Sequence, residues 1–391
     1  MTSSSSNQLN NLWADMTPAD FKIKLLNKYG EQTEYFGADQ NGEEKSQSFV
    51  ETVFDEIKAA GFSGYTSLTE LDWDIGIRAC TLHAMYELNL DHEIQYATST
   101  STLAANSSAF WQNRALKIIQ NQNHTATEAI RELFTRGATL DCERAADACV
   151  LKGVAEAFAC NGLTEQFDAL YTTTPMELKH RGWHAGQPLS QLPTKFIDSE
   201  KESILPGDRR YFTNLENYLS YNPRGFASGE HTVYMGKNQQ DEVYQAISLN
   251  NPFNRDKMLL FLAYNYDIDQ KAFQNFLYEQ LGQTDRHTPW KDFFPRIDLA
   301  LVESFKQDCA NALATYTQSI VPKKITPDNL KDHLPDLLRV YMDDLCDKID
   351  QDNKTGKYKM VRRIDTLELL KMVHILKPDA PKITMDTPTP K

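Results

Sequence analysis

A cysteine at the start of a predicted helix is the residue of this chain whose position most favours chemistry. Cys142 follows Asp141, a residue type that caps helices, in the run DCERAADACVLKGVAEAFACNG, which ends at Gly162. The N–H groups at a helix N-terminus lower the pKa of a cysteine and can stabilise an oxyanion that forms beside the sulfur. Cys142 is therefore a candidate nucleophile, and buried packing is the alternative interpretation.

The rest of this helix is predicted to pack closely. At 100° per residue, Cys149, Gly153 and Cys160 lie on nearly the same line as Cys142. A line of Cys and Gly lets another element approach, and we expect that element to be a sheet. We predict that Cys149 and Cys160 are packing residues and not a redox pair, because their positions on one helix do not favour a disulfide.

Other elements must hold this helix in place. Helical periodicity is present over residues 46–60 and from about residue 125 to Gly137. Residues 204–249 contain the strand pattern GEHTVYMGKN, which ends in Gly236-Lys237-Asn238, and helical patterns return beyond residue 250. The order indicates an α+β fold with helical regions at both ends.

Three segments resemble motifs of the bacterial protein-glutamine gamma-glutamyltransferases of the Bacillus spore-coat type. The first is TEAIRELFTRGATLDCERAADACVLKGVAEAF, the second PGDRRYFTN and the third SGEHTVYMG. They occur in the family's order and at similar spacing, and the resemblance is clearest over residues 105–250. The matching residues are Ala129, Ile130, Phe134, Gly137, Asp141 and Cys142, then Gly207, Asp208, Tyr211, Phe212 and Asn214, then Gly229, Glu230 and Gly236.

The resemblance implies a fold, a reaction and a set of site residues. The fold would be a papain-like or NlpC/P60-like core built around a cysteine nucleophile. Cys142 would be that nucleophile, Glu230 would be the acid/base residue, and Asp141 would stand where the family has a glutamate that handles substrate. The family works without calcium, so no cofactor and no metal are expected.

The sequence departs from the family pattern at one position. The family places a histidine after the strand that carries the glutamate, but here the corresponding stretch is KNQQDEVYQA. His231 is next to Glu230, but neighbours on a strand point to opposite faces. Because His231 shares its face with Val233 and Met235, we interpret it as a core histidine and assign Glu230 to the active-site groove.

The expected reaction is transfer of a glutamine acyl group from its carboxamide to a lysine amine, which cross-links proteins, or to water, which deamidates them. The expected partners are protein substrates that carry reactive Gln and Lys. Two other classes stay open: a papain-like cysteine protease, and a catalytically degenerate interaction protein, which the missing histidine would suit. An amine-incorporation assay separates the transferase from the protease, and thiol reactivity at Cys142 separates it from the interaction protein.

Two other patterns resemble metal sites but do not meet the requirements. His180 and His184 have helical spacing, but Gly182 lies between them and no third ligand is evident. The run DQDNKTGKYKMV begins like a calcium loop at Asp350, but its glycine comes one position late, and Val361 stands where the bidentate glutamate belongs.

Composition limits the remaining classes. The chain has 391 residues, 54 acidic and 41 basic, so its formal net charge of −13 argues against nucleic-acid binding. No stretch is apolar enough to predict membrane insertion. We find no signal peptide and no Cys-x-x-Cys pair, so the expected location is the cytoplasm, and export would need a route independent of a signal peptide.

The patterns together predict the domain organisation. We expect a flexible tail at residues 1–11, a transglutaminase-like catalytic domain at 12–250, a helical C-terminal region at 251–376 and a second flexible tail at 377–391.

Overall fold

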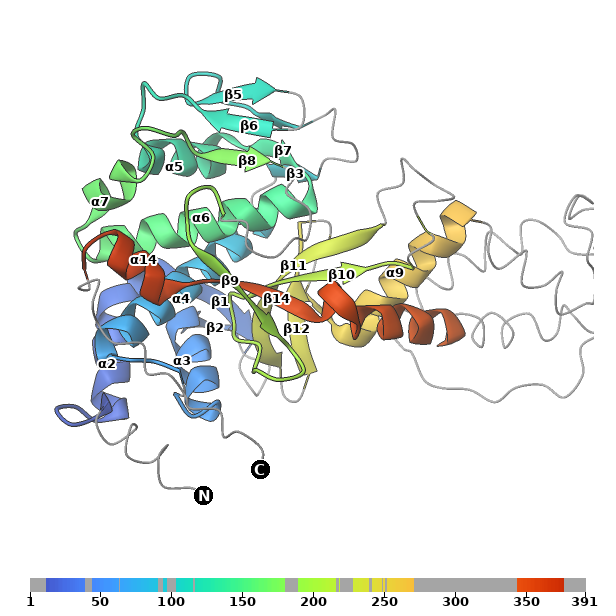
Figure 1. Cartoon of the computed structure of the whole chain (residues 1–391), viewed down its shortest axis with the longest axis horizontal. Helices are drawn as coiled ribbons and strands as arrows, with labels where there is room; N and C mark the ends of the chain where they lie inside the picture. The colour runs from blue at the N-terminus through green and yellow to red at the C-terminus, as the bar shows by residue number, and fades with distance from the viewer. Residues whose placement is uncertain are drawn as a thin grey trace, which may run out of the picture. The chain divides into compact units, whose positions relative to one another are not determined.

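Figure 1 shows the computed structural model of the chain. The chain divides into two compact units. Unit 1 contains Met1–Arg210, His231–Pro252 and Met360–Lys391, and unit 2 contains Tyr211–Glu230 and Phe253–Lys359. The structure describes residues 12–38, 44–62, 64–90, 94–96, 103–114, 117–179, 189–215, 218, 228–238, 241–247, 249, 252–270 and 343–375. The predicted tails, Cys309, His180 and His184 lie outside these residues.

The first helices of unit 1 begin at local caps. Helix α2 (Pro18–Tyr29) starts after Thr17, whose Oγ1 accepts a hydrogen bond from the N–H of Asp20 at 3.2 Å. Helix α3 (Phe49–Ala59) starts after Ser48 and buries the apolar face that the sequence predicted for residues 46–60. Helix α4 (Leu68–Leu90) is buried on most sides. A hairpin of β1 (Glu34–Ala38) and β2 (Glu44–Ser48) connects α2 to α3.

Two small sheets lead to the helix of the candidate nucleophile. One has the order β3-β7-β4 and the other the order β5-β6-β8. Helix α5 (Ala126–Arg136) connects β6 to β7 in the chain. It begins in a capping box of Thr125 and Glu128 and ends at Gly137, where φ is 79°. The strands are β3 (Ile94–Tyr96), β4 (Ala104–Ala105), β5 (Trp111–Arg114), β6 (Lys117–Gln120), β7 (Ala138–Leu140) and β8 (Glu177–Lys179).

Helix α6 (Cys142–Cys160) follows β7 directly and packs along α4 (Figure 1). Gly153 of α6 makes this close approach feasible, because a Cβ atom there would lie 2.3 Å from Thr81 Oγ1 and 2.6 Å from the Thr81 nitrogen. The predicted stripe of small residues is therefore a contact surface, although the partner at Gly153 is a helix and not the expected sheet. The short helix α7 (Thr164–Ala169) comes next.

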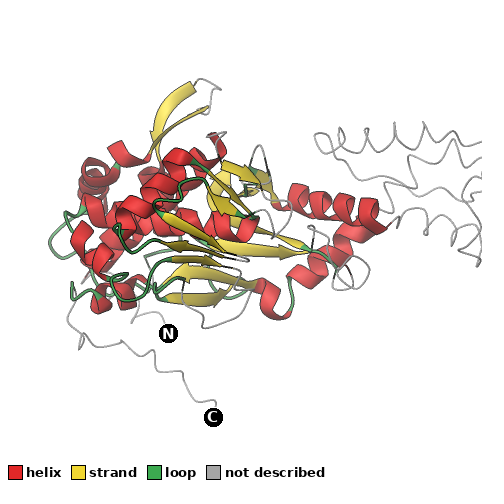
Figure 2. Cartoon of the chain, turned by 90° about the horizontal axis from the view of Figure 1, so that it is seen from above, coloured by secondary structure: helices red, strands yellow, loops and turns green. Residues whose placement is uncertain are grey.

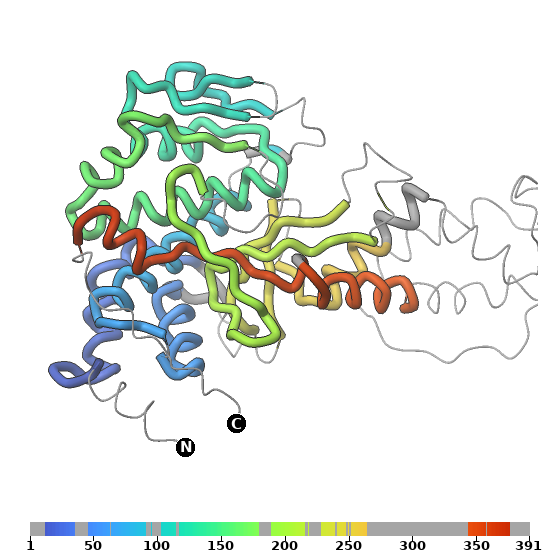
Figure 3. The backbone as a smooth tube through the Cα atoms, viewed as in Figure 1, coloured from blue at the N-terminus to red at the C-terminus, as the bar shows by residue number. Residues whose placement is uncertain are grey.

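Within the main sheet, β12, β11, β10, β14 and β9 are neighbours in this order, and the pairs β11/β12, β10/β14 and β14/β9 are antiparallel. Figure 2 shows its strands as one twisted layer. Strand β14 comes from the C-terminal end of the chain, and Figure 3 shows its red trace running beside the green trace of β9. The strands are β9 (Thr194–Asp198), β10 (Arg209–Thr213), β11 (Gly229–Asn238), β12 (Asp241–Gln245) and β14 (Met360–Ile364).

Strand β14 departs from the expectation that residues 251–376 are helical, although residues 255–270 and 343–353 of this region are helical and residues 271–342 lie outside the described residues. Residues 360–364 alternate too little for a clear strand pattern, but they pair in register with β9 from Met360↔Asp198 to Ile364↔Thr194. Helix α14 (Thr366–Met372) follows and begins at the side-chain cap of Asp365. The mixture of helices and antiparallel strands agrees with the predicted α+β class, whereas the predicted domain boundaries stay predictions.

Unit 2 contains β13 (Phe253–Asn254), α9 (Arg255–Gln270), a helical segment at 343–353 and a 3-10 turn at Gly356–Lys359. Buried Asn353 connects the helical segment to the chain at Thr213, accepting from the Thr213 N–H at 2.9 Å and donating to the Thr213 carbonyl at 2.8 Å. These residues overlap the sequence that resembled a calcium loop, and they form a helix, a 3-10 turn and the start of β14.

Candidate active site

Cys142 is the first residue of α6, and Asp141 is its N-cap, as the sequence predicted. Asp141 Oδ1 accepts a hydrogen bond from the Arg144 N–H at 2.9 Å, and its second carboxylate oxygen pairs with the Arg144 guanidinium. Cys142 is partly exposed. A partly exposed sulfur beside the N–H groups of a helix start has the local environment that favours thiolate chemistry.

Asp141 also neutralises the charge of Arg144, a role that the sequence did not indicate. The Arg144 side chain is fully buried, and the Asp141 side chain is 19% exposed. A buried guanidinium requires an anionic neighbour, so Asp141 both caps α6 and neutralises this charge. In this arrangement Asp141 orients the first turn of the helix that carries Cys142.

The other cysteines of the helix differ from Cys142 in their surroundings. Cys149 is fully buried, and burial raises the pKa of its thiol well above the ordinary value. Cys160, at the end of α6, is partly exposed, and a hydrogen bond from Cys80 lowers its pKa. The packing role predicted for Cys149 agrees with its burial, and its low thiolate content makes it a poor nucleophile.

A buried ion pair joins α6 to the main sheet. Asp147 of α6 pairs with Arg209 of β10, and both side chains are almost entirely buried. Arg209 stands opposite Arg362 of β14 in the antiparallel register, so two arginines occupy one face of the sheet. Sequence reasoning missed this contact, because Asp147, Arg209 and Arg362 come from distant parts of the chain and none of them lies in a recognisable charge pattern.

The Gly-Asp pair of the second motif has a structural role in unit 1. Asp208 is fully buried and accepts from Arg78 at 2.7 Å, from Arg363 at 2.6 Å and from the Leu205 N–H at 2.9 Å. Gly207 has φ +87°, and a Cβ atom there would lie 3.2 Å from Arg78 Cα and Cβ. The motif therefore links α4, the turn before β10 and β14.

The glycine of the third motif, Gly229, is packed inside unit 2. A Cβ atom on Gly229 would lie 2.3 Å from Tyr211 Oη and 2.4 Å from the Phe212 carbonyl oxygen. Tyr211 Oη donates to the Ser228 carbonyl at 3.0 Å. The tyrosine and phenylalanine of the second motif thus contact the start of the third, which explains why these residue types occur together.

Glu230 and His231 follow on β11, and both are buried, with 3% and 7% exposure. Val233 belongs to the hydrophobic core and Met235 packs against it, which agrees with the predicted core face. On the other face, Tyr234 donates through its hydroxyl to Glu56 at 3.1 Å. Cys142 belongs to unit 1 and Glu230 to unit 2, so the pairing of their roles stays a prediction.

The described residues contain no group of three or more His, Cys, Asp or Glu side chains that could hold a metal ion. In the same part of the chain, no helix is long and apolar enough to cross a membrane. The expectation of calcium independence stays a prediction.

A family model agrees with the resemblance found in the sequence. The family model described as protein-glutamine gamma-glutamyltransferase matches residues 28–245, more than half of the chain. A transglutaminase from Geobacillus stearothermophilus, solved without its C-terminal extension, is similar at 20% identity over 50% of this chain and 84% of that chain, with a TM-score of 0.39. No curated protein matches. On the strength of the family model, the chain belongs to the protein-glutamine gamma-glutamyltransferase family and is a transglutaminase, an acyltransferase that forms isopeptide bonds.

Proposed function

We propose that Cys142 is the nucleophile of this transglutaminase. One observation carries the proposal: a partly exposed cysteine occupies the first position of α6, after an N-cap that pairs with buried Arg144. The first N–H groups of a helix have no partner within it, so they are available to a thiolate and to an oxyanion. Among the helix's cysteines, only Cys142 lies at this end.

The reaction has two steps. The Cys142 thiolate attacks the carbonyl carbon of a glutamine side chain and forms a tetrahedral oxyanion. The C–N bond then breaks, the nitrogen takes up a proton and leaves as ammonia, and a gamma-glutamyl thioester remains. A lysine amine attacks this thioester and loses a proton, the C–S bond breaks, and the thiolate is regenerated with an isopeptide bond formed. If water attacks instead, the product is a glutamate side chain.

Glu230 is proposed as the group that carries protons in these steps, because it matches the acid/base position of the family motif and is buried on β11. Asp141 is proposed to act by orienting the first turn of α6. The proposed core is papain-like, and its support is a helix that begins at the nucleophile and contacts an antiparallel sheet through Asp147 and Arg209.

The proposed substrates are proteins with reactive Gln and Lys side chains, and the proposed reaction needs no cofactor and no calcium. We would incubate the full chain with a glutamine-containing protein and a fluorescent primary amine, with and without a calcium chelator. Stable labelling of the protein, equal in both samples, is the expected result. Labelling that stops with the chelator would contradict calcium independence without affecting the nucleophile.

Cys142→Ala and Cys149→Ala form a matched pair for this assay, because both remove one sulfur from α6. We expect Cys142→Ala to abolish labelling at an unchanged melting temperature, and Cys149→Ala to keep most of the activity. Equal losses in the two variants would refute the nucleophile assignment. Fragments without labelling would indicate a protease, and an unreactive Cys142 with neither product would indicate an interaction protein.

A further inference from the structure

Two cysteines from different helices of unit 1 meet at the end of α6 that is far from Cys142. Cys80 lies in the middle of α4, and Cys160 is the last residue of α6. The Cys80 thiol donates a hydrogen bond to the Cys160 sulfur. Two sulfur atoms that are distant in the sequence are therefore neighbours in the fold.

The packing of the two helices agrees with this contact. The ring of Trp73 on α4 meets the ring of Phe158 on α6 with 4.8 Å between the centroids. Further along α4, Glu87 pairs with Lys152 at 2.7 Å, so the two helices run in opposite directions. Cys80 lies two turns after Trp73, on the part of α4 that the C-terminal half of α6 covers.

Tyr29 of α2 identifies the same place from a third helix. A Cβ atom on Gly76 would lie 2.7 Å from the Tyr29 hydroxyl oxygen, and this oxygen accepts a hydrogen bond from Asn161 at 3.0 Å. Gly76 is one turn before Cys80 on α4, and Asn161 directly follows Cys160. The contacts of the neighbouring residues thus bring the two cysteines together without reference to the thiols.

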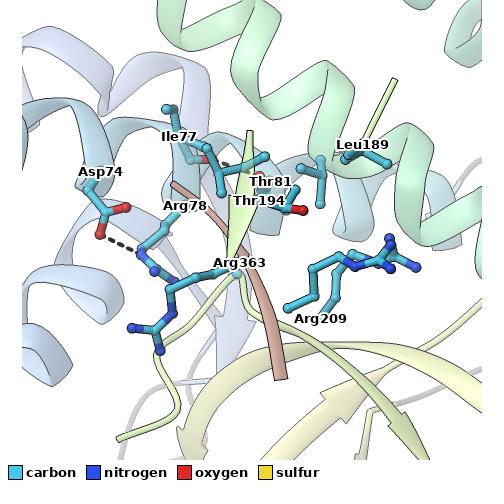
Figure 4. A pocket seen from close by; sticks show the side chains of 12 residues that line it. Asp74, Ile77, Arg78, Thr81, Leu189, Thr194, Arg209 and Arg363 are labelled. Atoms are coloured by element: carbon cyan, nitrogen blue, oxygen red, sulfur yellow. Dashed lines mark hydrogen bonds and ion pairs between the residues drawn. The ribbon is translucent and has the colours of Figure 1, made fainter. Parts of the chain in front are cut away.

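The two helices also approach each other closely enough for a short covalent link. The Thr81 hydroxyl bonds to the Ile77 carbonyl of its own helix at 2.7 Å (Figure 4). A Cβ atom on Gly153 would lie 2.6 Å from the Thr81 nitrogen and 2.8 Å from its Cα. A disulfide joins Cα atoms that are about 4.4–6.8 Å apart, and helices that touch through their backbones allow such separations.

The two thiols differ in exposure and in acidity. Cys160 is partly exposed, whereas Cys80 is fully buried. The hydrogen bond from Cys80 lowers the pKa of Cys160, although burial acts in the opposite direction. The same hydrogen bond, together with burial, raises the pKa of Cys80. Cys160 is therefore the thiol that an oxidant reaches and that reacts first, and Cys80 is placed to react second.

From the contact of the two sulfur atoms and their unequal exposure, we infer that Cys80 and Cys160 are a redox-sensitive pair, which a small-molecule disulfide oxidises to a disulfide bond. The Cys160 thiolate attacks one sulfur of the oxidant, the S–S bond of the oxidant breaks, and one thiolate leaves. The Cys80 thiol then loses its proton, its sulfur attacks the Cys160 sulfur, and the second thiolate leaves. Two protein thiols are oxidised, and one small disulfide is reduced to two thiols.

The bond would connect α4 to the end of α6 and close a long loop of the chain. Closing a long loop restricts the unfolded chain and so stabilises the folded one. The pair stays reduced in a reducing compartment and becomes a covalent link when the surroundings are oxidising. Because Cys142 stands at the opposite end of α6, the link leaves the proposed nucleophile outside the bond.

The direct test is peptide mapping of the full-length chain after incubation with oxidised glutathione. The remaining thiols are blocked with N-ethylmaleimide before digestion. We expect a linked pair of peptides that contain Cys80 and Cys160, which a reductant separates. A wild type in which Cys160 carries glutathione while Cys80 stays a thiol would overturn the inference, and so would Cys160 joined to a different cysteine.

Two single variants test the order of the steps. In Cys80→Ala, Cys160 should keep a bound glutathione, because the second thiol is missing. In Cys160→Ala, Cys80 should stay unmodified, because it is buried. Glutathione on Cys80 in a folded Cys160→Ala chain would contradict the assignment of Cys160 as the first thiol. The mapping of the wild type remains decisive if a variant fails to fold.

Thermal unfolding tests the consequence for stability. Oxidation should raise the melting temperature of the wild type by about 5 °C or more, and a reductant should reverse the change. Cys149→Ala, which removes a different sulfur from α6, should keep this shift, and Cys160→Ala should lose it. Equal melting temperatures of the reduced and the fully linked wild type would refute the stabilising role. A shift that persists in Cys160→Ala would assign the effect to other thiols and overturn the inference.

Discussion

At the residue scale, Asp141 has two structural roles, as a helix cap and as the partner of a buried charge, and substitutions can separate them. Its carboxylate caps α6 through the Arg144 N–H and also pairs with the buried Arg144 side chain. An asparagine at this position keeps the cap but loses the charge, and an alanine loses both.

Asp141→Ala should therefore lower the free energy of unfolding by ~1 kcal/mol for the cap and by ~1–3 kcal/mol more for the charged hydrogen bond, whereas Asp141→Asn should lose only the second part. Urea denaturation measures both values. If Asp141 only orients the helix, the turnover of folded Asp141→Asn should stay within a few-fold of the wild-type turnover. A 100-fold loss of turnover in folded Asp141→Asn would instead assign Asp141 a part in the chemistry.

Glu230 and His231 provide a second residue-scale prediction. Both are buried on β11, so burial alone does not tell them apart. Glu230→Gln should lower the turnover of amine incorporation by at least ~100-fold, because positioned acid/base groups contribute ~10²- to 10⁴-fold. His231→Gln should keep most of the activity and lower the melting temperature, as expected for a core residue. If His231→Gln is the inactive variant and Glu230→Gln the active one, the site works as a Cys-His pair.

At the scale of elements, the close approach of α4 and α6 depends on Gly153. An alanine in an open helix is more stable than a glycine by ~1 kcal/mol. Here the added Cβ atom would lie 2.3–2.8 Å from the oxygen, nitrogen and Cα of Thr81, so the two helices must move apart. The same contact places the C-terminal half of α6 and thereby the axis on which Cys142 stands.

Replacing a helical glycine with alanine usually raises the free energy of unfolding. Gly153→Ala should instead lower it by ~1–3 kcal/mol, the usual cost of overpacking. Urea denaturation is again the measurement. The double variant Thr81→Ala with Gly153→Ala should stay destabilised, because the nitrogen and Cα of residue 81 remain in the way. Full recovery in the double variant would show that only the hydroxyl obstructs the helix.

At the scale of the whole molecule, a strand from near the C-terminus completes the main sheet of unit 1, whose neighbouring strands come from the middle of the chain. Strand β14 lies between β9 and β10, and Arg363 on it pairs with fully buried Asp208. A chain without β14 loses its pairing with both neighbours and leaves Asp208 with one arginine fewer. The C-terminal part is thus a structural component of unit 1.

A chain that ends at residue 359 should therefore lack the cooperative unfolding transition of unit 1. A chain that ends at residue 375 should melt like the full-length protein, because it keeps β14 and α14 complete. Differential scanning calorimetry compares the three chains. A sharp transition near the full-length melting temperature in the chain that ends at 359 would show that β14 is dispensable.

The sequence by itself determined the features that depend on near neighbours. Asp141 and Cys142 at the start of α6, the helix over residues 46–60 and the end of α5 at Gly137 follow from caps and periodicity within a few residues. The motifs around Cys142, Asp208 and Glu230 were sufficient to predict that the chain belongs to the protein-glutamine gamma-glutamyltransferase family. Local rules suffice here because a cap or a helical face is formed by adjacent turns of one segment.

Only the tertiary structure decided which distant segments meet. The register Arg209↔Arg362, the pairing of Asp147 with Arg209 and the position of β14 join residues that lie more than 60 positions apart. A strand such as Met360–Ile364 is stabilised by its neighbours β9 and β10 more than by its own composition, so its residues alone do not reveal it. A buried charge is equally non-local, because its free energy depends on a partner that the fold must bring to it.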